Sequence, residues 1–224
     1  MNGRWHVTST VGLAVAAMAL TCVVAPPAAA GSSVPQIQVS APAAVSSGVL
    51  PKYRAKYKAI MGELGRLWAG NQNWFAEQVS YGDQLATTLT AALAIPSPEA
   101  KQLVDQLEKR AAEWGMEMFA TTDVEMPLDV PRIEKFRDAC MKMVKTQDDR
   151  DAVKYEFGRL ILAQDTQLIL TVGGDMTKVY GALVEGNVAA YRAASTTAQT
   201  DWGTANQTFT RALELLTIFG SPKH

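Results

Sequence analysis

Histidine and cysteine are nearly absent from this chain of 224 residues, which contains two of each. The histidines, His6 and His224, stand at opposite ends, so no imidazole occurs in the interior of the sequence. This absence excludes nucleophiles activated by histidine, histidine-ligated zinc and the Glu-x-x-His di-iron sites of helical bundles. We expect no metal or other cofactor, and the carboxylates remain as the candidates for catalysis.

A surplus of charge of either sign is also lacking. The chain has 21 Lys and Arg against 22 Asp and Glu, a formal net charge of -1. This balance does not indicate a nucleic-acid partner, which would require a basic face. After the first thirty residues no apolar run is long enough to cross a bilayer, so we expect no transmembrane segment in the mature chain.

The first thirty residues have the composition of a secretory signal peptide. Arg4 provides the positive start, residues 11–24 form a mostly apolar run, and three alanines at 28–30 precede Gly31. This order predicts cleavage near Ala30 and export to the periplasm or out of the cell. Cys22 would leave with the signal peptide, so Cys140 would remain alone and no internal disulfide could form.

Residues 31–50 contain no charged side chain and are rich in Ser, Ala, Pro, Val and Gly. Such a composition predicts a flexible linker because it offers too little apolar bulk for a core. From residue 51 onward apolar residues recur at steps of three and four, the spacing of amphipathic helices. We therefore expect one domain, residues 51–224, after the signal peptide (1–30) and the linker (31–50).

Cap and turn residues that interrupt the apolar spacing predict where each helix begins and ends. The first helix should run from Tyr53 to Pro96, with a break or kink near Gly70. The second should begin with Ser97 as its cap and end before a connection at residues 121–131. A third helix should follow and restart at Thr146, where Thr146 and Asp149 resemble a capping box.

Two adjacent glycines, Gly173 and Gly174, predict the next turn, and the last helix should extend from Tyr180 to Phe219. No alternating strand pattern competes with this interpretation. The fold class predicted is all-α: an elongated antiparallel bundle of about four long helices with coiled-coil-like spacing and short connections.

Methionine is concentrated around the only cysteine of the predicted domain, which raises the question of a copper site. Residues two apart on a helix point to nearly opposite sides, so Met116 with Met118, or Met141 with Met143, cannot hold one ion together. If the second and third helices form a hairpin, Met118 and Cys140 lie at levels about 10 Å apart. We therefore interpret Met118, Cys140 and Met143 as core filling, with Met116 and Met141 on flanking positions. Burial of Cys140 is favoured over a disulfide to another chain.

One candidate ligand-binding site combines aromatic rings with an amide. Trp68, Asn71 and Phe75 share a helix face, and such a group can form a platform for a sugar or a small amphiphile. The alternative is core packing. In that case Asn71 needs a buried hydrogen-bond partner or marks a kink.

A second candidate lies where the linker enters the domain. Four basic residues there alternate with tyrosines and could dock on an anionic envelope polymer or on lipid headgroups; they are Lys52, Arg54, Lys56 and Lys58. The alternative is a solvated helix end. Two acidic groups, Glu113 with Glu117 and the acids of 148–151, are interpreted as a solvated face and a helix start, and we expect the acids of the helices to stay solvated.

Three functional hypotheses remain open. The first is an exported, non-catalytic binding or structural protein of the cell envelope or secretome, with a protein or envelope polymer as partner and self-association through helix faces. The second is a carrier of a small apolar ligand, which predicts a cavity above ~300 Å³ near Trp68 or along the small residues of the last helix. The third is a carboxylate-dependent hydrolase, which predicts two facing acids, at least one with a raised pKa.

Overall fold

The computed structural model describes residues 48–221, apart from the side chains of Phe119 and residues 121–125. The signal peptide expected at 1–30 and most of the linker expected at 31–50 lie outside the described residues. Within residues 48–221 every regular element is a helix, so the all-α prediction is confirmed. A single β-bridge, between Val49 and Val144, is the only strand-like pairing in that range.

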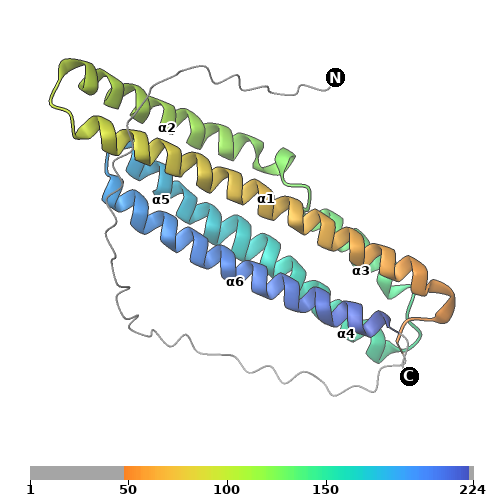
Figure 1. Cartoon of the computed structure of the whole chain (residues 1–224). Helices are drawn as coiled ribbons and strands as arrows, with labels where there is room; N and C mark the ends of the chain where they lie inside the picture. Colours follow the sequence, from red (N-terminus) through yellow and green to blue (C-terminus); the bar gives the residue numbers. More distant parts are fainter. Residues whose placement is uncertain (1–47, 222–224) are drawn as a thin grey trace, which may run out of the picture. The chain divides into compact units, whose positions relative to one another are not determined.

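The helices follow one another with short connections, as Figure 1 shows. Their bounds are η1 Pro51–Tyr53, α1 Arg54–Leu93, α2 Pro98–Glu125, α3 Val130–Met141, α4 Gln147–Ile161, η2 Leu162–Val172, α5 Gly173–Val184 and α6 Val188–Gly220. The stretch η2 is a π-helix that joins α4 to α5 without an intervening turn. The described residues therefore form four helical columns: α1, α2 with α3, α4 through α5, and α6.

Neighbouring columns run antiparallel. Near the start of α1, Tyr57 lies against Phe219 at the end of α6, whereas near the end of α1, Asp83 is bonded to Tyr191 at the start of α6. Similar pairings place α2 antiparallel to α1, and the proximity of Trp114 to Tyr180 and of Glu108 to Gly186 places α2 antiparallel to α5. The structure is thus an antiparallel helical bundle, as the sequence predicts.

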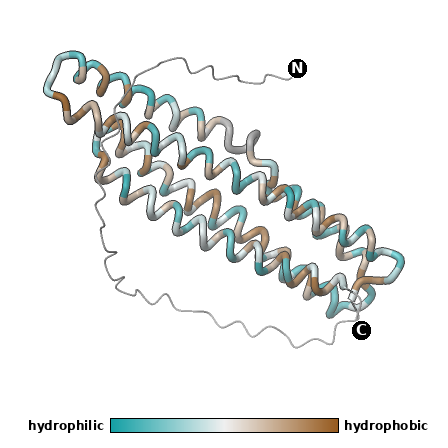
Figure 2. The backbone as a smooth tube through the Cα atoms, in the orientation of Figure 1, coloured by the Kyte–Doolittle hydropathy of each residue, from teal (hydrophilic) through white to brown (hydrophobic). Residues whose placement is uncertain are grey.

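Buried apolar side chains from all four columns form one core. Along each helix hydrophilic and hydrophobic residues alternate (Figure 2). Met118, Cys140 and Met143 are buried, as the core-filling interpretation predicts, whereas the side chain of Met116 is 66% exposed. Burial raises the pKa of the Cys140 thiol to about 12, so at neutral pH it stays protonated and unreactive.

Two predictions about the second column, α2 with α3, are wrong. Helix α2 continues to Glu125, so the connection begins at Met126 rather than at residue 121. In addition, α3 does not fold back on α2: it continues along α1 and packs against α4. The Thr and Asp residues at 121–123 favour turns only weakly, and packing of α2 on α1 and α5 overrides that preference.

The turn expected at Gly173 and Gly174 is also wrong, because both glycines lie within the continuous third column. The chain reverses instead at Gly186, whose φ of 66° suits glycine. The Gly186 and Asn187 amides donate to the Leu183 and Ala182 carbonyls, which is a Schellman motif. Asn187 then caps α6 by accepting a hydrogen bond from the Ala190 amide at 3.0 Å. The last helix therefore begins at Val188 and not near Tyr180.

Helix α1 is unbroken at Gly70, where a break or kink was expected. The glycine has a packing role, because a Cβ at this position would collide with the ring of Pro127 in the α2–α3 connection. The missing side chain lets that connection lie close to the α1 backbone. A glycine in a helical pattern therefore marked a contact between columns rather than an interruption.

The predicted caps are confirmed. The Ser97 hydroxyl accepts a hydrogen bond from the Ala100 amide at 3.1 Å. Thr146 and Asp149 form the predicted capping box at the start of α4. Asp149 is nevertheless fully buried, so the expectation that the acids stay solvated is wrong at this position. Its Oδ1 also accepts a hydrogen bond from the Gly48 amide at 3.4 Å.

Candidate ligand-binding groove

A column of four stacked aromatic rings joins α1 to α6. The Trp202 ring lies between those of Phe75 and Trp68, with centroid distances of 4.8 Å and 5.4 Å. On its other side Trp68 stacks on Phe209 at 4.1 Å. The two tryptophans therefore have both ring faces covered by protein, and these contacts fix the register between the two helices.

The three residues of the predicted aromatic and amide platform are all buried. The indole of Trp68 donates to Asn206 Oδ1 at 2.8 Å. The Asn71 amide accepts a hydrogen bond from the Leu128 amide and donates to the Leu128 carbonyl and to Gln164 Oε1. Asn71 thus has the buried partner that the core-packing alternative requires. Of the three, Phe75 also lines a groove.

This groove lies between α1 and α6, adjacent to the Phe75 end of the aromatic column, and has a volume of about 850 Å³. Its size falls in the range of small-molecule sites, about 300–1,000 Å³. The groove is open along one side. Its lining comes from consecutive turns of α1 and from one turn of α6: Gln72, Phe75, Ala76, Val79, Ser80, Asp83, Gln84, Thr87, Thr88, Gln199 and Trp202.

The lining divides into an apolar part and a polar part. Phe75, Ala76, Val79 and Trp202 provide the carbon surface. The polar part consists mainly of hydroxyls and side-chain amides; most of it lies from Ser80 onward along α1, and Gln72 lies beyond the apolar part. Among the described residues that line the groove, Asp83 is the only charged one.

The polar groups of the groove use much of their donor capacity within the protein. The Thr87 and Thr88 hydroxyls donate to backbone carbonyls one turn back, at 2.8 Å and 2.9 Å. The Gln199 amide donates to the Ser195 hydroxyl at 3.1 Å. The oxygens of these groups are therefore what the groove mainly offers to a ligand.

Tyr191 fixes the carboxylate of Asp83 by donating a hydrogen bond to its Oδ1 at 2.7 Å. Burial, followed by this hydrogen bond, raises the pKa of the Tyr191 phenol well above its usual value, so the phenol remains a donor. The Asp83 side chain itself stays exposed to the groove. Such a carboxylate can receive further hydrogen bonds from a ligand.

The sequence interpretation missed the α6 side of this site and the role of Asp83. Trp202 fits the apolar spacing of the last helix and is therefore expected only in the core. Gln199 and Asp83 have no distinctive spacing. Their proximity follows from the antiparallel register of α1 and α6, which no short stretch of sequence reveals.

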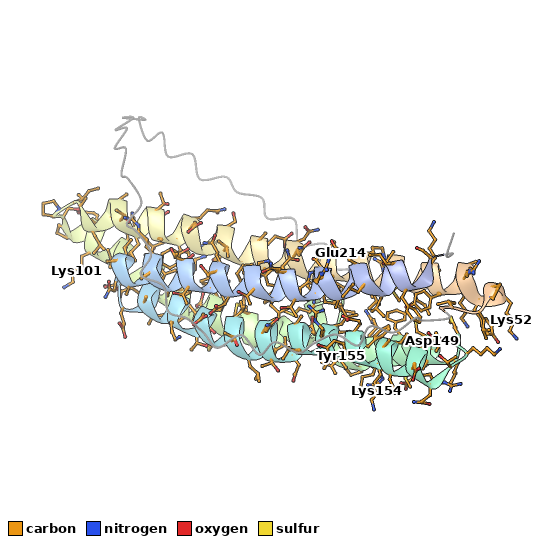
Figure 3. All side chains as sticks on the ribbon, turned by 90° about the horizontal axis from the view of Figure 1, so that it is seen from below. Lys52, Lys101, Asp149, Lys154, Tyr155 and Glu214 are labelled. Atoms are coloured by element: carbon orange, nitrogen blue, oxygen red, sulfur yellow. The ribbon has the colours of Figure 1, made fainter. Side chains whose placement is uncertain are left out.

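The four basic residues of the other predicted site are exposed, Lys52 in η1 and the other three at the beginning of α1. The Lys52 ammonium lies over the Tyr53 ring at 4.8 Å. Figure 3 places Lys52 at the end of the bundle opposite to Lys101. The docking of Lys52, Arg54, Lys56 and Lys58 on an anionic polymer or on lipid headgroups stays a prediction.

A pair of acids joins α5 to α6. Asp175 is buried, its Oδ1 accepts a hydrogen bond from Lys178 at 2.7 Å, and its Oδ2 has no hydrogen-bond partner. The neighbouring carboxyl is that of half-buried Asp201, whose pKa is raised by burial and by its interaction with Asp175. When the Asp201 carboxyl is protonated, its O–H group can donate a hydrogen bond to the Asp175 carboxylate. The buried Asp175 also contradicts the expectation that acids stay solvated.

This acid pair leads to a prediction about pH. Between the ordinary pKa of an aspartate, about 3.9, and the raised pKa of Asp201, the folded state binds more protons than the unfolded state. The free energy of unfolding should therefore fall as the pH rises through this window. Asp201→Asn removes the titration, so urea denaturation from about pH 4 to pH 7 should give a flatter pH profile for the variant than for the wild type.

The matched control is Asp105→Asn, which removes an exposed acid on α2 and should retain the wild-type slope. Equal slopes for Asp201→Asn and the wild type would contradict the prediction.

The acid pair meets one condition of the hydrolase hypothesis, two facing acids with one raised pKa. Neither acid lines the α1–α6 groove, and hydrolysis by this pair stays a prediction.

Two further observations concern the described part of the chain as a whole. No helix between residues 48 and 221 is long and apolar enough to cross a membrane. In the same range no three residues among His, Cys, Asp and Glu gather as they would around a metal ion.

The acids of the face predicted to be solvated include Glu113, which lies 3.9 Å from Lys109 across one helical turn.

Comparison with known proteins identifies no relative of this chain. No protein-family model matches the chain, and no curated protein or solved structure is significantly similar to it. The class defined here is therefore an antiparallel all-α bundle with a groove between its first and last helices.

Proposed function

We propose that this protein is a non-catalytic binding protein that holds a small amphiphilic ligand in the groove between α1 and α6. One observation carries the proposal: carbon surface and polar acceptors stand side by side in an open volume of about 850 Å³. A ligand with an apolar body and a polar head matches both parts of this lining. The proposal combines the binding-protein hypothesis with the carrier hypothesis.

We further propose that the protein acts outside the cytoplasm, in the cell envelope or among secreted proteins. The support is the order of charge, apolar run and small residues in the first thirty positions. N-terminal sequencing of the protein recovered from its source should find a chain that begins near Gly31. A chain that retains residues 1–30 would contradict this part of the proposal.

Binding in the groove can be tested by filling it. Ala76 is an exposed lining residue, so Ala76→Trp places an indole in the groove without removing a core side chain. We expect the neutral apolar dye Nile red to bind the wild-type protein and to bind Ala76→Trp at least about tenfold more weakly, a difference of about 1.4 kcal/mol. The measurement is a fluorescence titration at constant protein concentration.

The matched control is Ala59→Trp, at an exposed alanine of α1 that lies outside the groove. It should bind the dye like the wild type. Circular dichroism should show the same helical content for both variants. Equal loss of binding in the two variants, or no binding of dye to the wild-type protein, would overturn the proposal.

A further inference from the structure

We infer that the ligand of this groove carries a positively charged headgroup, an ammonium held at Asp83, and an apolar body that extends toward Phe75. This inference rests on the proposed function, because it names the chemical class of the amphiphile. Three features of the groove carry it: the sign of its charge, the hydrogen-bonding capacity that it leaves free, and its length.

Charge is the first feature. Asp83 is the only charged residue among the described residues of the lining, and no lysine or arginine faces it from within that lining. An anionic headgroup would meet a like charge with no cation to offset it, whereas an ammonium would meet an opposite charge. Because Asp83 is exposed, salt should weaken this attraction.

Hydrogen bonding is the second feature. The hydroxyls of Thr87 and Thr88 donate into their own helix, so their remaining capacity is to accept. Tyr191 donates to Oδ1 of Asp83, a residue of the groove lining, and Oδ2 of this carboxylate is a further acceptor. An ammonium brings three donors and no acceptor, which matches this set. A sulfate or carboxylate brings only acceptors, and it would have to use the remaining N–H groups of the glutamine side chains or the Ser80 hydroxyl beside the Asp83 carboxylate.

Length is the third feature. Phe75 and Asp83 are eight positions apart on the continuous helix α1, which corresponds to about 12 Å along its axis. Ala76 and Val79 provide apolar surface in this interval. A linear alkyl chain of similar length can therefore lie along the helix while its head reaches the carboxylate. The groove thus determines the direction in which the ligand lies, with its head at Asp83 and its tail toward Phe75, as well as its charge.

The experiment compares three amphiphiles with the same ten-carbon tail: decylammonium, decyl glucoside and decyl sulfate. Each is titrated calorimetrically into the full mature protein below its critical micelle concentration. We expect decylammonium to bind about five- to tenfold more tightly than the glucoside, because a hydrogen bond to a charged group is stronger than a neutral one and solvent screens part of the gain at an exposed carboxylate. Decyl sulfate should bind most weakly.

Asp83→Asn tests the role of the carboxylate, because asparagine keeps an oxygen that can accept the Tyr191 hydrogen bond. The variant should lose the preference for decylammonium, so that decylammonium and decyl glucoside bind to it with similar affinity. The matched control is Asp105→Asn, which removes one negative charge from the exposed surface of α2 and should keep the preference. Added sodium chloride should reduce the preference in the wild type.

The outcomes separate this inference from the function on which it rests. If all three amphiphiles bind equally and Ala76→Trp abolishes their binding, the groove is a binding site but the inference is wrong. Tighter binding of decyl sulfate than of decylammonium would also overturn it, as would an equal effect of Asp83→Asn on all three. If none of the amphiphiles binds, both the inference and the proposed function fail.

Discussion

Replacement of Asn71 by alanine should lower the free energy of unfolding by about 3–5 kcal/mol. The Asn71 amide bonds the N–H and the C=O of Leu128 and the side chain of Gln164, all of them buried. Alanine would leave these groups in the core without partners, and each unsatisfied group costs about 1–3 kcal/mol. Urea denaturation followed by circular dichroism would measure the difference.

Asn73→Ala is the matched control, because Asn73 is exposed on the same helix. Its effect should stay within about 0.5 kcal/mol. A loss below about 1 kcal/mol for Asn71→Ala would show that water or a rearrangement of the α2–α3 connection replaces the lost partners. The network of Asn71, Leu128 and Gln164 would then not be what ties this connection to α1 and η2.

Replacement of Trp68 by alanine should lower the free energy of unfolding by about 3–5 kcal/mol, the range for large aromatic residues removed from a core. Trp68 lies in the interior of the aromatic column, stacked on Trp202 and Phe209, and its indole donates to Asn206. Alanine would remove both stacking contacts and the hydrogen bond, and would open a cavity between α1 and α6. Thermal and urea denaturation would measure the loss.

Trp68→Phe distinguishes packing from ligand contact. Phenylalanine keeps a ring between Trp202 and Phe209 but cannot donate to Asn206, so we expect a smaller loss, about 1–2 kcal/mol. Because both faces of Trp68 are covered by protein, this variant should bind Nile red like the wild type. If Trp68→Phe is as stable as the wild type but loses binding, Trp68 belongs to the ligand site rather than to the core.

Local sequence was sufficient for much of the secondary structure. The three-and-four spacing of apolar residues identified the helices because one stripe of each helix must be buried in a bundle. The caps at Ser97 and Thr146 were predictable because they depend on residues three apart in sequence. The burial of Met118 and Cys140 followed from their places on the apolar stripes.

The errors arose where residues distant in sequence decided the outcome. Gly173 and Gly174 indicate a turn by themselves, yet packing of the third column on α6 keeps them helical. The true turn at Gly186 and Asn187 has a local signal, a glycine followed by a capping asparagine, but the sequence interpretation places Gly186 among the small residues of the last helix. Asp175 was expected to be solvated, and only the packing of α5 shows that it is buried.

The order of apolar and polar residues in the sequence determines that this protein forms amphipathic helices and buries their apolar stripes against one another. Helical periodicity is a local property, so it can be recognised without coordinates. The groove depends on a different property, the register that places Gln199 and Trp202 of α6 beside Phe75 and Asp83 of α1. These residues are more than one hundred positions apart, and only the packing of the aromatic column between the two helices brings them together.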